Sequence, residues 1–177
     1  PTYWLRASEV YFLRAEAALV WEGFGSADSW YKQGIDMSFQ ENGVTDPVDD
    51  YMNSNLSPRA YVLSHYQYGQ TLSAPCETTV KFEGTTEQKL EKIMIQKWIA
   101  LFPNGQEAWT EWRRTGYPKL NVIKTLKGAV QGATLEGGIR RMIYPTSFSQ
   151  TNEGKAIYEA ALKLFNNGAG GEDKSST

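Results

Sequence analysis

The sequence has little of the chemistry that most enzymes need, since it contains one cysteine, Cys76, and one histidine, His65. A single cysteine excludes an internal disulfide and a cluster of thiolate metal ligands. A serine or cysteine hydrolase would depend on His65 as its base, yet no nucleophile or carboxylate stands near it at a spacing typical of a triad. Phosphate-binding glycine loops and the Gly-x-Ser-x-Gly motif are also missing. We expect a protein that is not an enzyme and holds no metal or cofactor.

Surplus charge and long apolar runs are absent as well. There are 18 Lys and Arg against 20 Asp and Glu, so the net charge is −2. Because nucleic-acid binding needs clustered positive charge, no nucleic-acid partner is expected. No apolar run reaches the roughly 18 residues that would span a bilayer, and the start does not resemble a signal peptide. We expect a mature, processed or partial chain, since no Met precedes Pro1.

Aromatic residues, in contrast, are abundant at 13% of the chain, with 6 Trp, 10 Tyr and 7 Phe. Most such rings belong to a core, but exposed Tyr and Trp also stack on sugars and on partner surfaces. Tyr61, Tyr66 and Tyr68 lie close together in a segment interrupted by turn-forming residues. They form either a stacking platform for a sugar or a group of rings packed against the body of the protein.

Hydrophobic periodicity and capping signals predict helices over most of the chain. They cover residues 5–21, 26–43, 85–102, 104–116 and 151–165, with shorter pieces at 47–52 and 58–65. We expect the apolar stripe of the first helix (Val10, Leu13, Ala17, Val20) and that of the last (Ile157, Ala160, Ala161, Leu164, Phe165) to be buried. Residues 119–138 are studded with glycine and predict loops, and residues 168–177 predict a flexible polar tail. The fold class is therefore all-α, built from helix pairs with long loops.

Two carboxylates beside tryptophans leave alternatives open. Glu107 and Glu111 share one face of the helix at 104–116, an arrangement from which a glycosidase can build its acid and base. The adjacent Arg113 and Arg114 favour a structural role instead, with ion pairs to acidic residues and guanidinium stacking on tryptophan. The expected pairs join Arg113, Arg114, Arg140 and Arg141 to Glu9, Glu16 or Glu111.

Three stretches, taken together, resemble one known family. The first is residues 6–17, RASEVYFLRAEA, which resembles the family's pattern Arg-x-x-Glu-x-x-x-Leu-x-Ala-Glu-Ala. The second is residues 95–116, IQKWIALFPNGQEAWTEWRRTG, and the third is the closing run RRMIYP at 140–145 with GGED at 170–173. Together the three stretches resemble the SusD/RagB family, over nearly the whole chain and in the family's order.

The resemblance implies a fold and a function for residues 1–177. It implies the C-terminal portion of a SusD-like domain, all-α, with tetratricopeptide-like helix pairs and long loop excursions. Such a protein stands at the cell surface on the outer membrane of Bacteroidetes, lipid-anchored in its full length through a cysteine upstream of Pro1. It captures glycans or other nutrients and delivers oligosaccharides to a SusC-like TonB-dependent transporter.

Within this chain the ligand-binding residues we expect are Tyr61, Tyr66 and Tyr68. The alternative is a helical scaffold that contacts the transporter, with the ligand site in an N-terminal part outside these residues. A glycoside hydrolase that uses Glu107 and Glu111 is the third possibility.

Overall fold

The computed structural model describes residues 3–63, 70–121, 139, 141–165 and 168–171. The chain forms two compact units, Pro1–Asn121 and Val122–Thr177. The elements of the first unit are α1 (Ala7–Val20), α2 (Ala27–Asn42), α3 (Val48–Met52), β1 (Tyr61–Leu63), β2 (Gln70–Leu72), α4 (Thr86–Ala100) and α5 (Gly105–Thr115). The second unit contains a 3₁₀ helix, η1 (Thr146–Gln150), and α6 (Asn152–Lys163).

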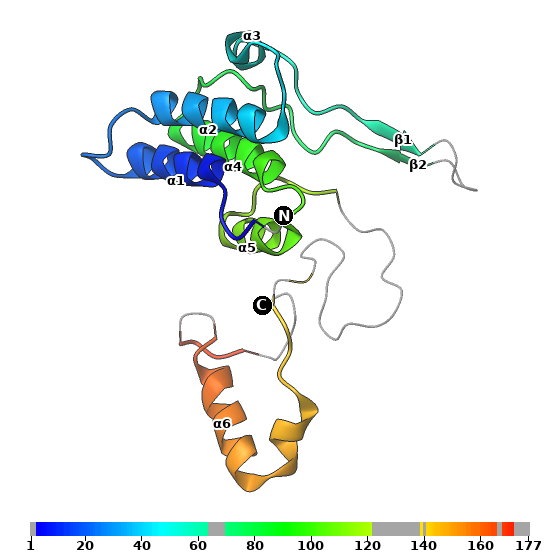
Figure 1. The fold of residues 1–177 in the computed structure, drawn as a ribbon. Coiled ribbons are helices and arrows are strands. Elements are labelled where there is room, and N and C mark those ends of the chain that lie inside the picture. The colour runs from blue at the N-terminus through cyan, green and yellow to red at the C-terminus, as the bar shows by residue number, and fades with distance from the viewer. Residues whose placement is uncertain (1–2, 64–69, 122–138, 140, 166–167, 172–177) are drawn as a thin grey trace. The chain divides into compact units, whose positions relative to one another are not determined.

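Helices α1, α2 and α4 lie side by side and enclose the core of the first unit (Figure 1). The apolar residues buried there are Phe12, Ala15, Tyr31, Ile35, Val80, Ile93, Met94 and Ala100. Phe12 packs directly over Gly34 of α2, where a Cβ atom would lie 2.8 Å from the ring. The missing side chain of Gly34 therefore lets α1 and α2 approach closely.

The helix ends agree with the capping signals in the sequence. Ser26 accepts a hydrogen bond from the backbone N–H of Ser29 at the start of α2, and Thr151 accepts one at the start of α6. Thr85 and Gln88 form a complete capping box at the start of α4. Gly43 ends α2 with φ of 68°, in the left-handed region that glycine adopts without strain. The five longer predicted helices are confirmed, as is the short helix at 47–52.

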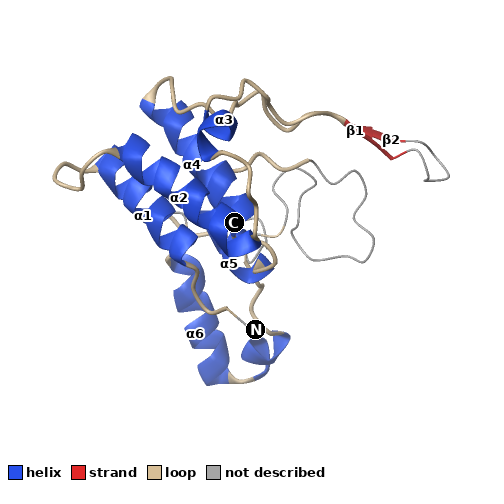
Figure 2. Cartoon of the chain, turned by 45° about the horizontal axis from the view of Figure 1, so that its top comes forward, coloured by secondary structure: helices blue, strands red, loops and turns tan. Residues whose placement is uncertain are grey.

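The short helical piece predicted at 58–65 is wrong, because Tyr61–Leu63 form a strand. This strand, β1, pairs antiparallel with β2 in a two-stranded hairpin, with Tyr61 opposite Leu72 (Figure 2). A helix this short persists only where another element packs on it, as α2 does on α3, and no described helix contacts β1. Tyr61 and Val62 also favour extended backbone, so this segment forms a strand paired with β2 and not a helix.

Most residues of the two apolar stripes are exposed and none is fully buried, so the prediction that the stripes are buried is wrong; Ala17, Ala161 and Phe165 are half-buried. On α1, Val10, Leu13 and Val20 are 40, 41 and 54% exposed, while Ser8, Glu9, Phe12 and Ala15 are buried. On α6, Ile157 and Leu164 are 53 and 75% exposed, and no residue of that helix is buried. Periodicity identifies an apolar face, but it does not show that the chain itself supplies a partner for that face.

The second unit is held by rings around Tyr144. This ring stacks on Phe165 at 6.4 Å between centroids and meets Tyr158 edge-on at 5.8 Å. Part of the predicted tail is hydrogen-bonded, because the N–H of Gly168 donates to the carbonyl of Leu164 and that of Gly171 to the carbonyl of Leu162. Residues 172–177 lie outside the described residues, as do residues 122–138 of the predicted loop region.

Candidate ligand-binding site

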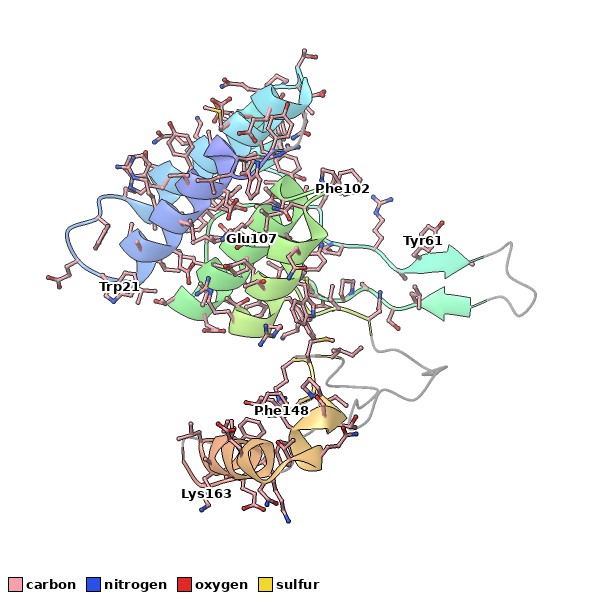
Figure 3. The ribbon with its side chains drawn as sticks, turned by 60° about the horizontal axis from the view of Figure 1, so that its bottom comes forward. Trp21, Tyr61, Phe102, Glu107, Phe148 and Lys163 are labelled. Atoms are coloured by element: carbon pink, nitrogen blue, oxygen red, sulfur yellow. The ribbon has the colours of Figure 1, made fainter. Side chains whose placement is uncertain are left out.

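The three tyrosines predicted to bind ligand belong to the hairpin segment. Tyr61 lies on β1 and is 64% exposed, and Figure 3 shows it apart from the helices. The two strands contact each other and none of the described helices. Tyr66 and Tyr68 lie outside the described residues. The Tyr61 ring is therefore presented to solvent and is not packed against the body of the protein.

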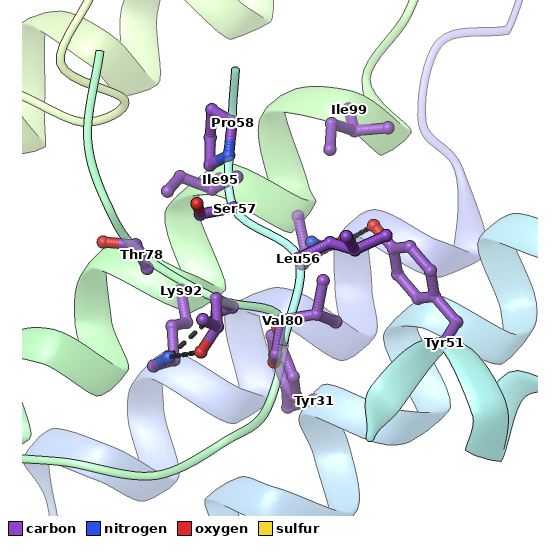
Figure 4. Close-up of a pocket in the computed structure, with 12 residues that line it drawn as sticks. Tyr31, Tyr51, Leu56, Ser57, Pro58, Thr78, Val80, Lys92, Ile95 and Ile99 are labelled. Atoms are coloured by element: carbon purple, nitrogen blue, oxygen red, sulfur yellow. Dashed lines mark hydrogen bonds between the residues drawn. The ribbon is translucent and has the colours of Figure 1, made fainter. Parts of the chain in front are cut away.

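A cavity of about 240 Å³ lies at the base of this hairpin (Figure 4). The segment that leads into β1 forms one wall with Leu56, Ser57 and Pro58, and the segment that follows β2 forms the other. Helix α4 contributes Ile95 and Ile99. The same two segments thus carry the hairpin and shape the cavity.

Internal hydrogen bonds hold the walls of the cavity in place. Lys92 of α4 donates to the carbonyl of Thr79 at 2.8 Å and to its hydroxyl at 3.0 Å, and Tyr31 donates to the carbonyl of Val80 at 2.8 Å (Figure 4 shows the Lys92 bonds). Burial lowers the pKa of Lys92 and raises the pKa of Tyr31. These contacts anchor segment 78–80 on α4 and α2, so the cavity is preformed.

The groups left for a ligand include apolar carbons, two hydroxyls, and the amide nitrogen of Gln96, whose carbonyl accepts from Tyr51. Ser57 and Thr78 stand on opposite walls, and among the described residues neither hydroxyl has a hydrogen-bond partner. Leu56 and Ile99 are 63 and 53% exposed at the edge of the cavity. This mixture suits a sugar, which presents a C–H face to apolar side chains and hydroxyls to polar ones.

The charged residues of α1, α4 and α5 form a separate network. Arg114 makes a bidentate ion pair with Glu16, at 2.6 and 2.8 Å, and also contacts Glu111 at 2.7 Å. Arg113 lies over the Trp109 ring at 4.5 Å. The ion pairs of Arg114 and the stacking of Arg113 on tryptophan are therefore confirmed. Arg141 lies over the rings of Tyr144 and Phe165 and not in one of the predicted ion pairs, and Arg140 lies outside the described residues.

Lys97 completes the network and was missed by the sequence reasoning. Its ammonium is buried 3.3 Å from Glu111 Oε1 and 3.8 Å from Glu9 Oε1. Burial raises the pKa of Glu9, a shift that the charge of Lys97 opposes. Burial alone would raise the pKa of Glu111 as well. The hydrogen bond from Arg114 and the charge of Lys97 outweigh burial, so the pKa of Glu111 is lowered. A signal was present, because Lys97 lies one turn from both Ile93 and Leu101 on the apolar face of α4.

The ion pairs of this network involve Glu111, one of the two carboxylates considered as a possible acid and base of a glycosidase together with Glu107. Both oxygens of Glu111 already face cations, Oε1 toward Lys97 and Oε2 toward Arg114. Glu107 lies on α5 in Figure 3, where its backbone N–H donates to the Asn104 side chain at the start of the helix. Among the described residues, no group of three His, Cys, Asp or Glu side chains is placed to hold a metal ion.

Comparison with known proteins identifies the family. The family model described as "Susd and RagB outer membrane lipoprotein" matches residues 1–177. The chain belongs to the SusD-like family. No curated protein matches the chain. Within the described residues, no helix of this SusD-like chain is both long and apolar enough to pass through a bilayer.

Solved structures of SusD homologues resemble the chain over nearly its whole length. A homologue from Bacteroides thetaiotaomicron is 40% identical with a TM-score of 0.82, and the match covers 99% of this chain and 37% of that one. A homologue from Bacteroides ovatus is 40% identical with a TM-score of 0.81, covering 97% and 36%. A chitin-binding homologue from Flavobacterium johnsoniae is 38% identical with a TM-score of 0.78, covering 98% and 35%. The SusD-like chain thus spans little more than one third of these relatives.

Proposed function

We propose that this SusD-like protein captures oligosaccharides at the outer surface of the outer membrane and delivers them to a SusC-like TonB-dependent transporter, without breaking a bond. In this proposal residues 1–177 are the C-terminal portion of a SusD-like domain, and the full-length protein is held by a lipid anchor. The observation that carries it is the preformed cavity at the base of a hairpin that presents Tyr61 to solvent. The chitin-binding homologue supports glycans as the ligand class.

The contacts proposed within this chain are the hairpin tyrosines and the cavity beside them. Tyr61, with Tyr66 and Tyr68, would stack on sugar rings. Ser57 and Thr78 would bind hydroxyls at the base of the hairpin. Binding and release suffice for this role, so no catalytic residue is assigned.

Titration with neutral oligosaccharides tests the proposal. We expect saturable binding with no release of reducing ends, and Tyr61→Ala should weaken the affinity about two- to tenfold through loss of ring stacking. Tyr66→Ala and Tyr68→Ala should act in the same direction. Phe102→Ala is the matched control, because Phe102 is 78% exposed and lies outside the cavity. Binding that none of the tyrosine variants weakens would remove the hairpin from the site.

The scaffold alternative is favoured by one observation, the exposed apolar stripe of α1. Val10, Leu13 and Val20 face solvent on one helix and offer a contact surface for another protein. If no oligosaccharide binds while a SusC-like transporter does, and Leu13→Glu abolishes that contact, the scaffold function replaces glycan capture in this chain.

A further inference from the structure

A second cavity, of about 570 Å³, lies on the other side of the segment that walls the first one. It is formed by residues 75–79 and 83–84 against α4, with Lys119 at its edge. Thr78, Thr79 and Lys92 line both cavities. Its volume falls within the roughly 300 to 1,000 Å³ of small-molecule sites.

Glu91 of α4 lines this second cavity with a group that the fold does not satisfy. The residue is 8% exposed, and its Oε1 atom has no hydrogen-bond partner among the described residues. A buried acceptor without a partner is costly, and most such groups in native proteins bind a donor. A donor from outside the described residues is therefore the expected partner of Glu91.

The charges around the cavity indicate what kind of donor it is. Glu83 is already neutralised by Lys81 at 3.0 Å, which leaves Glu77 and Glu91 against Lys92 and Lys119. Two negative and two positive groups favour neither an anion nor a cation. A neutral ligand that both donates and accepts hydrogen bonds matches this lining, and a sugar hydroxyl does both.

We propose that this cavity binds one neutral sugar unit, with Glu91 accepting a hydrogen bond from a sugar hydroxyl. The inference rests on the proposed glycan-binding function and extends it, because it places a second sugar subsite beside the hairpin cavity. Lys92 also lines this cavity, and two bonds to Thr79 leave one N–H of its ammonium for the same ligand.

Two variants of Glu91 test this subsite in the 177-residue chain. We expect Glu91→Leu to raise the Kd for cellotriose, maltotriose or chitotriose about tenfold, by loss of a buried hydrogen bond. Its unliganded Tm should be unchanged or higher, since the unpaired acceptor is gone. Glu91→Gln keeps one carbonyl oxygen and should raise the Kd about threefold, and it serves if the leucine variant does not fold. Glu22→Gln, an exposed glutamate outside both cavities, should bind as the wild type does.

Calorimetric titration separates failure of the subsite from failure of the function. Wild-type affinity in both Glu91 variants, together with weakened binding in Tyr61→Ala, overturns the subsite and leaves water as the partner of Glu91. No binding of any trisaccharide by the wild type overturns glycan binding itself. Tighter binding of trigalacturonate or of a glucosamine trimer than of the neutral sugars overturns the neutral ligand class.

Discussion

Lys97 places a positive charge inside the helical core, where only 1% of the residue is exposed. The burial is tolerable because Glu9 and Glu111 supply two carboxylates within 4 Å. The three residues come from α1, α4 and α5, so one charged group joins three helices. Arg114 extends the network by pairing Glu111 with Glu16.

We predict that Lys97→Met destabilises the protein by about 3–5 kcal/mol, because the two carboxylates would remain buried without their shared cation. Urea unfolding measures the change. Lys32→Met is the control, since Lys32 pairs with Asp49 at the surface and its loss should leave the midpoint nearly unchanged. A loss below about 1 kcal/mol for Lys97→Met would contradict a structural role for the network.

The two glutamates should give opposite responses to acid. Glu111 has a lowered pKa, so it contributes stability above its ordinary value of 4.5 and loses that contribution as the pH falls. Glu9 has a raised pKa, so as the pH falls it takes up its proton in the folded protein before it does so in the unfolded chain. Protonation of Glu9 therefore stabilises the folded protein as the pH falls. We therefore expect the free energy of unfolding to fall less steeply with decreasing pH in Glu111→Gln than in the wild type, and more steeply in Glu9→Gln. Urea unfolding between about pH 3 and 6 measures both slopes, and equal slopes would refute the assignment.

Single residues show how far the sequence could predict the contacts. Arg114 and Glu111, three positions apart on a helix, were expected to pair, and they do. The ion pairs of Lys97 could not be predicted from sequence spacing, since Glu9 and Glu111 belong to other helices. Likewise Ser57 and Thr78 face one cavity only because tertiary structure brings their segments together.

Among the elements, α1 and α2 depend on Gly34 for their close contact. Alanine usually stabilises a helix relative to glycine by about 1 kcal/mol. Here the new Cβ would meet the Phe12 ring at 2.8 Å, and Phe12 is 1% exposed and has no room to move. We predict a net destabilisation of about 1–3 kcal/mol for Gly34→Ala. Thermal melts should show Gly105→Ala, where nothing lies within 4 Å, unchanged or more stable. A higher Tm for Gly34→Ala would contradict the packing.

The boundaries of the helices were predictable because their signals are local. Ser26, Thr85 and Thr151 cap helix starts through their own side chains, so the sequence alone marks those positions. The hairpin was not predictable, because three-residue strands carry almost no periodic signal and form only when paired. The burial of the apolar stripes was not predictable either, since it depends on what lies against each helix.

At the scale of the molecule, the buried apolar residues among those that the structure describes all belong to the first unit. They run from Phe12 to Ala108, and Lys97 with its partners lies in the same unit. We predict that a chain truncated to residues 1–121 keeps a cooperative thermal transition. Truncation after residue 102 is the control, because it removes Glu111 and Arg114 and should lower the Tm. Circular dichroism measures both, and loss of cooperativity in the 1–121 chain would refute an autonomous first unit.

The start of α1 has a consequence for the order in which the helices form. Arg6 provides no side-chain cap there, and the backbone N–H and hydroxyl of Ser8 donate instead to Glu41 in the last turn of α2. An isolated α1 would therefore fray at this end, because its first turn lacks an acceptor until α2 has formed and folded back. The start of α1 thus becomes stable only together with α2. The rate at which the turn between the two helices closes therefore limits how early in folding this helix pair can form.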